Sequence, residues 1–192
     1  MTKSNSLITL AHEFIRRKIK IGAITIDATL GNGHDTLFLA QSVGHFGLVY
    51  GFDIQQQALD NTHQRLQEAN SLDQVRLILD SHAKLLQYID RNHHAQISAA
   101  MFNLGYLPGS DKTIQTHSAS TLEGLNAALQ LLASHGIVTI LVYPGHQDGE
   151  KELHAVEQWC LQLDKGSYQI TLHLSKVASN LAPQLFIIEK ID

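Results

Sequence analysis

The stretch Ile24-Thr25-Ile26-Asp27-Ala28-Thr29-Leu30-Gly31-Asn32-Gly33-His34-Asp35-Thr36 decides the fold that we expect for this chain. Its apolar first half predicts a buried strand, and its glycines predict a turn into a helix that begins around His34 or Asp35. A second apolar strand, Leu48 to Phe52, is followed by Asp53, about 20 residues after the glycines. This arrangement indicates the nucleoside-binding half of a doubly wound α/β domain.

The residues around the glycines also favour one kind of cofactor. Gly31 and Gly33 permit positive φ and let a ligand approach the main chain, while Asp53 can accept both hydroxyls of a ribose. Thr36 stands where a dinucleotide fingerprint has its third glycine, and Asp35 would repel a phosphate. A cofactor with a ribose but no phosphate therefore fits better, which favours S-adenosylmethionine over NAD. A purely structural turn that binds no ligand is the alternative.

The composition predicts a single domain over residues 1–192, including an N-terminal helical segment at 1–22. Hydrophobic residues make up 44% and charged residues 17%, a balance typical of soluble globular proteins. No apolar run approaches the roughly 20 residues that span a bilayer, and no signal-peptide pattern is present, so we expect a cytoplasmic protein. The net charge of -4 argues against a general polyanion binder.

The cysteine and histidine residues indicate whether the chain can form a disulfide or hold a metal ion. Cys160 is the single cysteine, so no internal disulfide can form, and its place beside Trp159 in a helical pattern predicts a buried core thiol. The 12 histidines are scattered, without a His-Glu-x-x-His or Cys-x-x-Cys pattern. We therefore expect no metal site.

Strand and helix patterns alternate along the chain, which predicts an α/β fold with a mainly parallel sheet covered on both faces. The first helix is amphipathic, with Leu7, Leu10, Ala11 and Phe14 on one face. The last two strands have no helix between them and should pair antiparallel. Seven strands with this ending are typical of the Rossmann-like sheet of class I methyltransferases. The further predicted helices are 55–69, 84–90, 113–133 and 149–163, and the further strands are 75–79, 97–103, 137–143 (expected to lie centrally), 168–174 and 185–189.

Ligands of open α/β sheets bind beyond the carboxyl ends of the strands, and here these ends carry polar residues or glycine. Asn103-Leu104-Gly105-Tyr106 stands where amino-group methyltransferases have an Asn/Asp-Pro-Pro-Tyr element. Asn103 would hold a target nitrogen by accepting its hydrogens. Tyr106 would stack on a base or line the transfer channel, with a tyrosine packed on the domain as the alternative. We expect Asp80, Ser81 and His82 at an adenine edge. The full set of predicted cofactor contacts is Asp27, Gly31, Asn32, Gly33, Asp35, Asp53, Gln55, Asp80, Ser81 and His82.

The chain resembles the YtqB-type methyltransferases over essentially its whole length. The resemblance is carried by the blocks Asp27-Ala-Thr-Leu-Gly-Asn-Gly-His-Asp-Thr36, Phe52-Asp53-Ile54-Gln55, Asp80-Ser81-His82, Phe102-Asn-Leu-Gly-Tyr-Leu-Pro-Gly109 and Tyr143-Pro-Gly-His146. It implies a class I fold, S-adenosylmethionine as methyl donor, and methylation of 5-aminomethyl-2-thiouridine at the wobble position of tRNA. The cofactor contacts that it implies are Asn32, Gly33, Asp53, Gln55, Ser81 and His82. Pro144 departs from the expected pattern before Gly145-His146.

On this hypothesis the methyl group passes to a primary amine, with Asn103 as amine holder, Tyr106 as base or channel contact, and His146 as proton acceptor. The basic cluster of Arg16, Arg17, Lys18 and Lys20 is either an RNA contact or a solvated helix face. A homodimer would widen the platform for an anticodon loop. Two other functions stay open: a class I methyltransferase that acts on rRNA or a small molecule, and a nucleotide-binding module without catalysis.

Overall fold

A seven-stranded sheet with the order β3-β2-β1-β4-β5-β7-β6 forms the centre of the protein. It is seen in a computed structural model that describes residues 6–105, 115–145, 148–175, 179 and 181–192. The strands are β1 (Ile24–Asp27), β2 (Leu48–Asp53), β3 (Val75–Leu79), β4 (Ile97–Leu104), β5 (Leu132–Val142), β6 (Tyr168–Leu174) and β7 (Gln184–Lys190).

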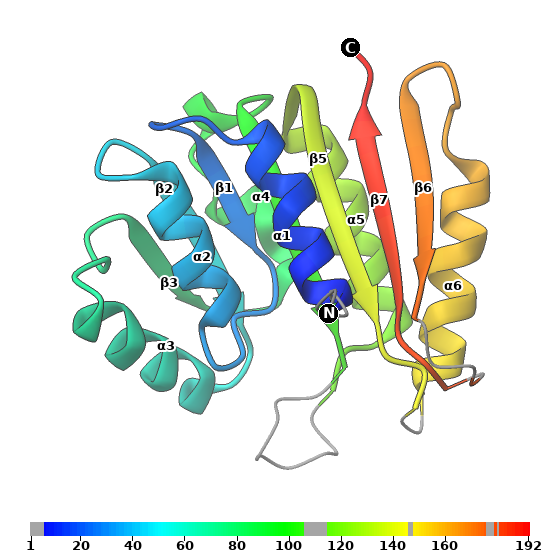
Figure 1. Cartoon of the computed structure of the whole chain (residues 1–192), viewed down its shortest axis with the longest axis horizontal. Coiled ribbons are helices and arrows are strands. Elements are labelled where there is room, and N and C mark those ends of the chain that lie inside the picture. Colours follow the sequence, from blue (N-terminus) through cyan, green and yellow to red (C-terminus); the bar gives the residue numbers. More distant parts are fainter. Residues whose placement is uncertain (1–5, 106–114, 146–147, 176–178, 180) are drawn as a thin grey trace, which may run out of the picture.

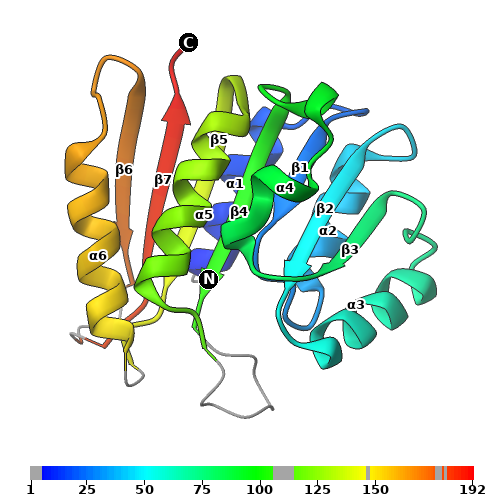
Figure 2. The same ribbon diagram turned by 180° about the vertical axis from the view of Figure 1, so that it is seen from behind.

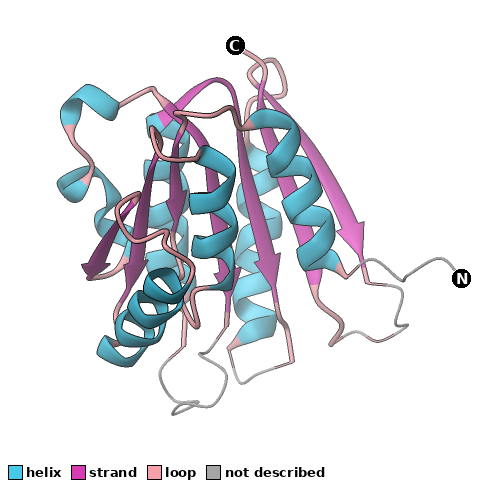
Figure 3. Cartoon of the chain, turned by 60° about the vertical axis from the view of Figure 1, so that its left-hand side comes forward, coloured by secondary structure: helices cyan, strands magenta, loops and turns pink. Residues whose placement is uncertain are grey.

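Helices cover both faces of the sheet (Figures 1, 2 and 3). One face carries α1 (Leu7–Lys18), α2 (His34–Val43) and α3 (Gln56–Glu68), and the other carries α4 (Leu85–Tyr88), α5 (Ser118–Leu131) and α6 (Gly149–Gln162). Each layer has its own apolar core. Ile15, Leu39 and Leu66 are fully buried in the first, and Phe102 and Leu125 lie in the second. Among the described residues, no helix is both long and apolar enough to cross a membrane.

The strand pairing confirms the predicted sheet. Strands β1 to β5 pair in parallel, and β7 runs antiparallel between β5 and β6. Strand β5 is flanked by β4 and β7, so it is an interior strand as its β-branched, apolar sequence suggested. The observed bounds of β3 and β6 coincide with the predicted ones.

Two predicted boundaries were wrong. Helix α5 begins at Ser118 rather than near 113, since residues 115–117 are not helical and Thr116 is hydrogen-bonded to Gly105. Strand β5 begins at Leu132 rather than Ile137, and its early part contains His135 with a positive φ of 61°. The short helix expected over 84–90 is present as α4, Leu85–Tyr88, and a 3₁₀ turn, His82–Lys84, precedes it.

The order of the strands places a crevice between β1 and β4. The chain moves outward from β1 through β2 to β3, and then returns to β4 on the other side of β1. The loops that follow β1 and β4 therefore separate at the carboxyl edge of the sheet, where doubly wound folds bind their ligands.

Candidate functional site

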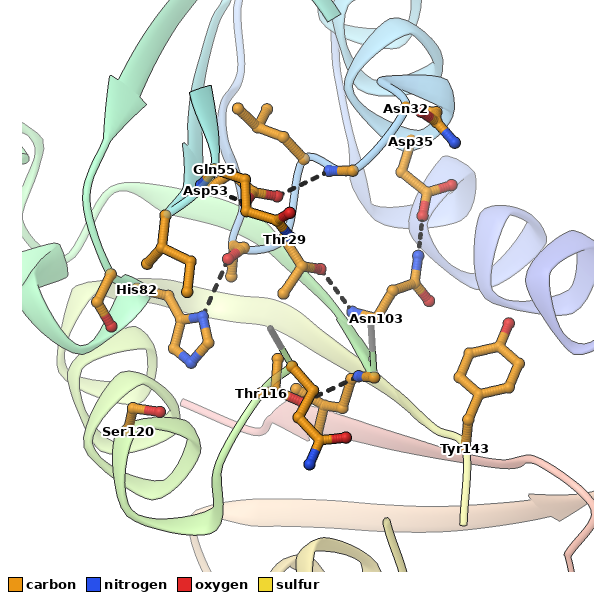
Figure 4. Close-up of a pocket in the computed structure, with 18 of the residues that line it drawn as sticks. Thr29, Asn32, Asp35, Asp53, Gln55, His82, Asn103, Thr116, Ser120 and Tyr143 are labelled. Carbon is orange, nitrogen blue, oxygen red and sulfur yellow. Dashed lines mark hydrogen bonds between the residues drawn. The ribbon is translucent and has the colours of Figure 1, made fainter. Parts of the chain in front are cut away.

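One large cavity, of about 880 Å³, opens at this carboxyl edge. Its size lies within the range of small-molecule and cofactor pockets. Figure 4 shows part of its lining, contributed by loops that follow β1, β2, β3, β4 and β5. The predicted residues that line it are Gly31, Asn32, Asp35, Asp53, Gln55, Asp80, Ser81, His82 and Asn103. Tyr143, from the strand end that begins the Tyr143-Pro-Gly-His146 block, lines it as well, together with unpredicted residues such as Ile8, Gln115 and Thr116.

Asp53 holds the glycine turn against the end of β2. Its Oδ2 accepts the Gly31 N–H at 3.0 Å, and its Oδ1 accepts the Gln55 N–H at 3.0 Å. Burial raises the pKa of the Asp53 carboxyl, while the backbone N–H donors act to lower it. Because a carboxylate oxygen accepts more than one hydrogen bond, both oxygens keep capacity for hydroxyls in the cavity.

Both glycines of the turn are needed for their backbone conformation, and Gly33 is also packed closely against α3. Gly31 and Gly33 both adopt positive φ, 52° and 75°. Gly33 lies against α3, where an added Cβ would be 2.8 Å from Thr62 Oγ1 and 2.9 Å from Thr62 Cα. Gly33 is not among the residues that line the cavity. The structure therefore explains it by helix packing rather than by access of a ligand to the main chain.

Asp27 lies beneath the cavity rather than in its lining. It is fully buried, accepts the Thr29 N–H at 3.2 Å, and accepts the hydroxyl of Thr36 at 2.6 Å. Burial, with a smaller contribution from the charge of Asp35, raises the pKa of Asp27 to about 7. Thr36 is thus a hydrogen-bond donor at the position where a dinucleotide site has glycine. We expected Asp27 to contact the cofactor, but its carboxylate instead shapes the loop that carries Thr29.

Asp35 and Asn103 form the side of the cavity opposite Asp53 (Figure 4). The Asn103 side-chain amide donates to Asp35 Oδ2, and the Asn103 backbone N–H donates to Thr29 Oγ1 at 2.7 Å. The other carboxylate oxygen of Asp35 contacts His12 Nε2 at 2.6 Å. Each oxygen of Asp35 therefore already has a protein donor. This arrangement makes Asp35 a support for Asn103, a role that its sequence position did not suggest.

The loop after β3 forms a third wall. Asp80 accepts hydrogen bonds from Lys84 Nζ at 3.0 Å and Tyr88 Oη at 2.7 Å, and these contacts lower the pKa of Asp80 to about 2. His82 is buried, and burial lowers its pKa to about 4. Its Nδ1 lies 3.1 Å from the carbonyl oxygen of Ala28, so Nδ1 is the protonated nitrogen, and Nε2 is an acceptor that has no partner in the part of the chain that the structure describes.

Glu152 is a buried glutamate that we did not predict as a site residue, and it supports the side of the cavity that Thr116 lines. Glu152 on α6 accepts the hydroxyls of Thr116 and Thr121, each at 2.6 Å. Thr116 in turn accepts the Gly105 N–H at 2.9 Å, and its own N–H donates to Gly105 O at 2.8 Å. This network ties the end of β4 to α5 and α6. Only the apolar spacing around Glu152 hinted at its burial.

The remaining residues discussed from the sequence differ in where the structure places them. Tyr106 and His146, two of the predicted catalytic residues, lie outside the described residues. Tyr143, which was not singled out as a site residue, lines the cavity with its hydroxyl directed toward the Asp35 and Asn103 side (Figure 4). Cys160 is buried, and burial raises its thiol pKa to about 12, as expected for a core residue. No cluster of metal-binding side chains occurs within the described part of the chain.

The basic cluster lies toward the carboxyl end of α1, away from the pocket residue Ile8 at its amino end. Lys18 forms an ion pair with Glu189 at 2.5 Å. The guanidinium groups of Arg16 and Arg17 lie over the rings of Phe38 and Phe14, with the Cζ atoms 5.1 and 5.6 Å from the ring centroids. These contacts give three of its four members an intramolecular role.

The order of the sheet, its antiparallel β7 and the pocket beside Asp53 define a protein of the class I methyltransferase fold. The chain belongs to the family described as "Putative rRNA methylase", whose profile matches residues 49–189. It is also similar to the chloroplastic tRNA (mnm(5)s(2)U34)-methyltransferase of Arabidopsis thaliana, with 39% identity over 156 residues, which is 77% of this chain and 56% of that protein. The chain spans about half the length of the curated relatives that it matches.

Solved structures agree with this assignment. A Clostridium thermocellum protein described in the same words as the family superposes with a TM-score of 0.93 and 39% identity, covering 100% of both chains. A Streptococcus mutans protein crystallised in complex with SAH (S-adenosylhomocysteine) superposes with a TM-score of 0.85 and 37% identity, covering 99% of each chain. The predicted fold and family resemblance are confirmed.

Proposed function

We propose that this protein is an S-adenosylmethionine-dependent methyltransferase that N-methylates the aminomethyl group of 5-aminomethyl-2-thiouridine at the wobble position of tRNA. The proposal rests mainly on one observation: two opposite sides of the same cavity carry different hydrogen-bond acceptors. Asp53, an acceptor for ribose hydroxyls, lies on one side, and Asn103, an acceptor for amine hydrogens, lies on the other. The similarity to a tRNA methyltransferase and to an SAH-bound protein supports the same substrate and cofactor.

The residues present fit S-adenosylmethionine. Asp53 would accept the ribose hydroxyls, and the exposed side chain of Ile54, 56% accessible, would be covered by the adenine ring. The loop Asp80-Ser81-His82 would face the adenine edge. His82 Nε2 is a buried acceptor without a hydrogen-bond partner among the described residues, so this part of the wall keeps an unsatisfied polar atom. The bound cofactor would supply an electrophilic methyl group on its sulfonium.

Asn103 would act on the acceptor amine. Its Nδ2 is used by Asp35, so its Oδ1 is the free end of the amide, and this oxygen is directed toward the side of the cavity that Tyr143 lines (Figure 4). A carbonyl oxygen can accept an N–H from the unprotonated amine and so direct the nitrogen lone pair toward the methyl carbon. The C–N bond forms as the S–C bond breaks, and the secondary ammonium product then releases one proton. The remaining candidates for that proton, Tyr106 and His146, stay predictions.

The test is an assay with methyl-labelled S-adenosylmethionine on two tRNA preparations, one unmodified at the wobble uridine and one that carries 5-aminomethyl-2-thiouridine. We expect label only in the second, and mass spectrometry of its nucleosides should show the methylaminomethyl product. Label in rRNA, or in a small amine but not in tRNA, would contradict the substrate. Binding of S-adenosylmethionine with no transfer to any acceptor would contradict the enzyme.

Asn103→Ala gives a sharper form of the same test. We expect a loss in kcat of roughly 100-fold, because misplacement of a reacting group can cost this much. Affinity for S-adenosylmethionine should change little, since Asn103 is assigned to the acceptor side. Asn92→Ala is a matched control, because Asn92 is exposed and lies outside the cavity lining.

A further inference from the structure

A chain of side-chain contacts links three elements behind the acceptor wall. His12 on α1 contacts Asp35 on α2 at 2.6 Å, and Asp35 accepts the side-chain amide of Asn103 on β4. Asp35 is only 6% exposed, so its charge is held largely away from water. His12 is also mostly buried, because only 21% of its side chain is exposed. The three residues are far apart in the sequence and meet only through the packing of α1 and α2 on the same face of the sheet.

The chemistry of these groups fixes the direction of each hydrogen bond. An ionised carboxylate only accepts, so both of its partners must donate. His12 therefore donates through Nε2–H, and Asn103 donates through Nδ2–H. As a result, Asn103 Oδ1 points away from Asp35, toward the side of the cavity that Tyr143 lines (Figure 4). An asparagine without such a partner could rotate by 180° and present its NH₂ group, which cannot accept a hydrogen from an amine.

The ring of His12 is itself held in place. It stacks on Phe38 with the ring centroids 3.8 Å apart and an interplanar angle of 4°. Arg16 covers Phe38 as well, with its Cζ 5.1 Å from the ring centroid. On the same helix, Ala11 and Ile15 are buried against the sheet, which fixes the rotation of α1. The imidazole is thus held at Asp35 by ring packing and helix packing together.

We propose that His12 is a positioning residue. It holds Asp35 in the orientation that makes Asn103 present its carbonyl oxygen to the acceptor. This inference rests on the proposed function for its consequence in catalysis, but not for the orientation of the amide. It assigns to α1 a part in the acceptor site in addition to its part in the core.

The first test measures the amide directly. In ¹⁵N NMR spectra of the wild-type protein, the side-chain NH₂ of Asn103, assigned with Asn103→Ser, should exchange slowly with solvent because it is bonded to a buried carboxylate. His12→Phe keeps an aromatic ring for Phe38 but removes the donor, so exchange should become faster and the NH₂ signals should shift. His12→Gln supplies an amide donor and should restore the wild-type signals. Unchanged Asn103 signals in His12→Phe would overturn the proposal.

The second test separates positioning from binding. We expect His12→Phe to keep its affinity for S-adenosylmethionine and its KM for tRNA while kcat falls by roughly 10- to 100-fold, the range for losing a hydrogen bond to a charged group. His12→Gln should recover most of that loss. Asp35→Asn should be as slow as His12→Phe, because an amide at this position can donate to Asn103 Oδ1 and turn it away from the cavity.

The experiment also needs a control substitution and a measurement that shows whether each variant is folded. His63→Phe makes the same substitution at an exposed position on α3 and should leave both kcat and the Asn103 signals unchanged. Thermal unfolding of each variant shows whether it is folded, and a His12→Phe variant that fails to fold leaves His12→Gln and Asp35→Asn to decide. If the wild type methylates no tRNA, the proposed function fails while the NMR test still decides the orientation of Asn103. A kcat in His12→Phe equal to that of the active wild type would overturn the positioning role.

Discussion

Asp53 has a role in the fold and, on the proposed function, a second role as a contact of the cofactor ribose. It closes the glycine turn through Gly31 N–H and begins α3 through Gln55 N–H. Asp53→Ala should weaken S-adenosylmethionine binding by roughly 10- to 100-fold, since hydrogen bonds to a charged group contribute about 1.5–3 kcal/mol. Isothermal titration calorimetry measures this change, with the exposed Asp60→Ala on α3 as the control. Equal affinity in Asp53→Ala and wild type would remove the ribose contact from the proposed site.

We expect the buried Asp27 to make a contribution to stability that decreases as the pH rises. The pKa of its carboxyl is about 7 in the folded chain against an ordinary value of 3.8, so the folded chain retains a proton that the unfolded chain releases. Its contribution to stability is therefore complete below about pH 4 and is lost as the pH rises through about 7. His82 acts in the opposite direction, because its lowered pKa of about 4 removes stability as the pH falls from 6.5.

The two effects separate in a comparison with Asp27→Asn, which keeps a similar shape but does not titrate. We expect the free energy of unfolding of the wild type, relative to the variant, to decrease between pH 4.5 and pH 7.5. Urea denaturation at a series of pH values measures it. A difference that stays constant over this range would show that Asp27 is ionised in the folded chain throughout.

At the scale of elements, Glu152 joins α5 and α6 to the edge of the pocket. Its carboxylate is fully buried and accepts the hydroxyls of Thr116 and Thr121. Glu152→Ala leaves both hydroxyls without their acceptor and creates a cavity, so we expect a loss of about 2–4 kcal/mol in the free energy of unfolding. Glu152→Gln, which still offers an acceptor, should lose less.

Chemical denaturation measures both variants of Glu152. The control is Glu157→Ala on the same helix, whose side chain is 40% exposed and whose removal should cost no more than about 0.5 kcal/mol. If Glu152→Ala were as stable as Glu157→Ala, the network at Thr116 would not be a significant support for the pocket wall.

The elements also show which features the sequence could predict. The hydrophobic pattern found every strand. The interior strands are short apolar runs bounded by turn residues, while the edge strands β3 and β6 are partly exposed, and β6 alternates apolar with polar residues. The pattern failed at the start of α5, where Thr116 pairs with Gly105 instead of continuing the helix, and at the start of β5, where His135 has positive φ. The first boundary depends on the pairing of Thr116 with Gly105, and the second on the pairing of Leu132 with Ile97, which are contacts between residues that are not neighbours in the sequence.

The same distinction holds for the site. The Gly31 turn and Asp53 are local signals tied to one strand–turn–helix unit, so the sequence placed them correctly at the cavity. The roles of His12 and Glu152 arise from helix packing, and neither residue stands in a recognisable motif. Asp35 was found by its position in the turn, but its partners were not, because His12 and Asn103 lie on other elements.

At the scale of the whole molecule, the cavity lies where the sheet reverses its order and therefore touches both halves of the fold. Gly31 and Asp53 belong to the β1–β2 half, while Asn103 and Tyr143 follow β4 and β5. A ligand that fills the cavity contacts both halves at once. It should then stabilise the domain as a unit, because binding to the folded state alone shifts the whole unfolding equilibrium.

This coupling predicts the effect of SAH on thermal unfolding. At about 100 times its Kd, SAH should add about 2.7 kcal/mol to the stability, which corresponds to an increase in Tm of roughly 5–11 °C for a chain of this size. Calorimetry should show one transition that moves as a whole, and Asp53→Ala should show a much smaller increase at the same SAH concentration. Two transitions, of which only one responds to SAH, would mean that the halves on either side of β1 unfold separately and that the ligand holds only one of them.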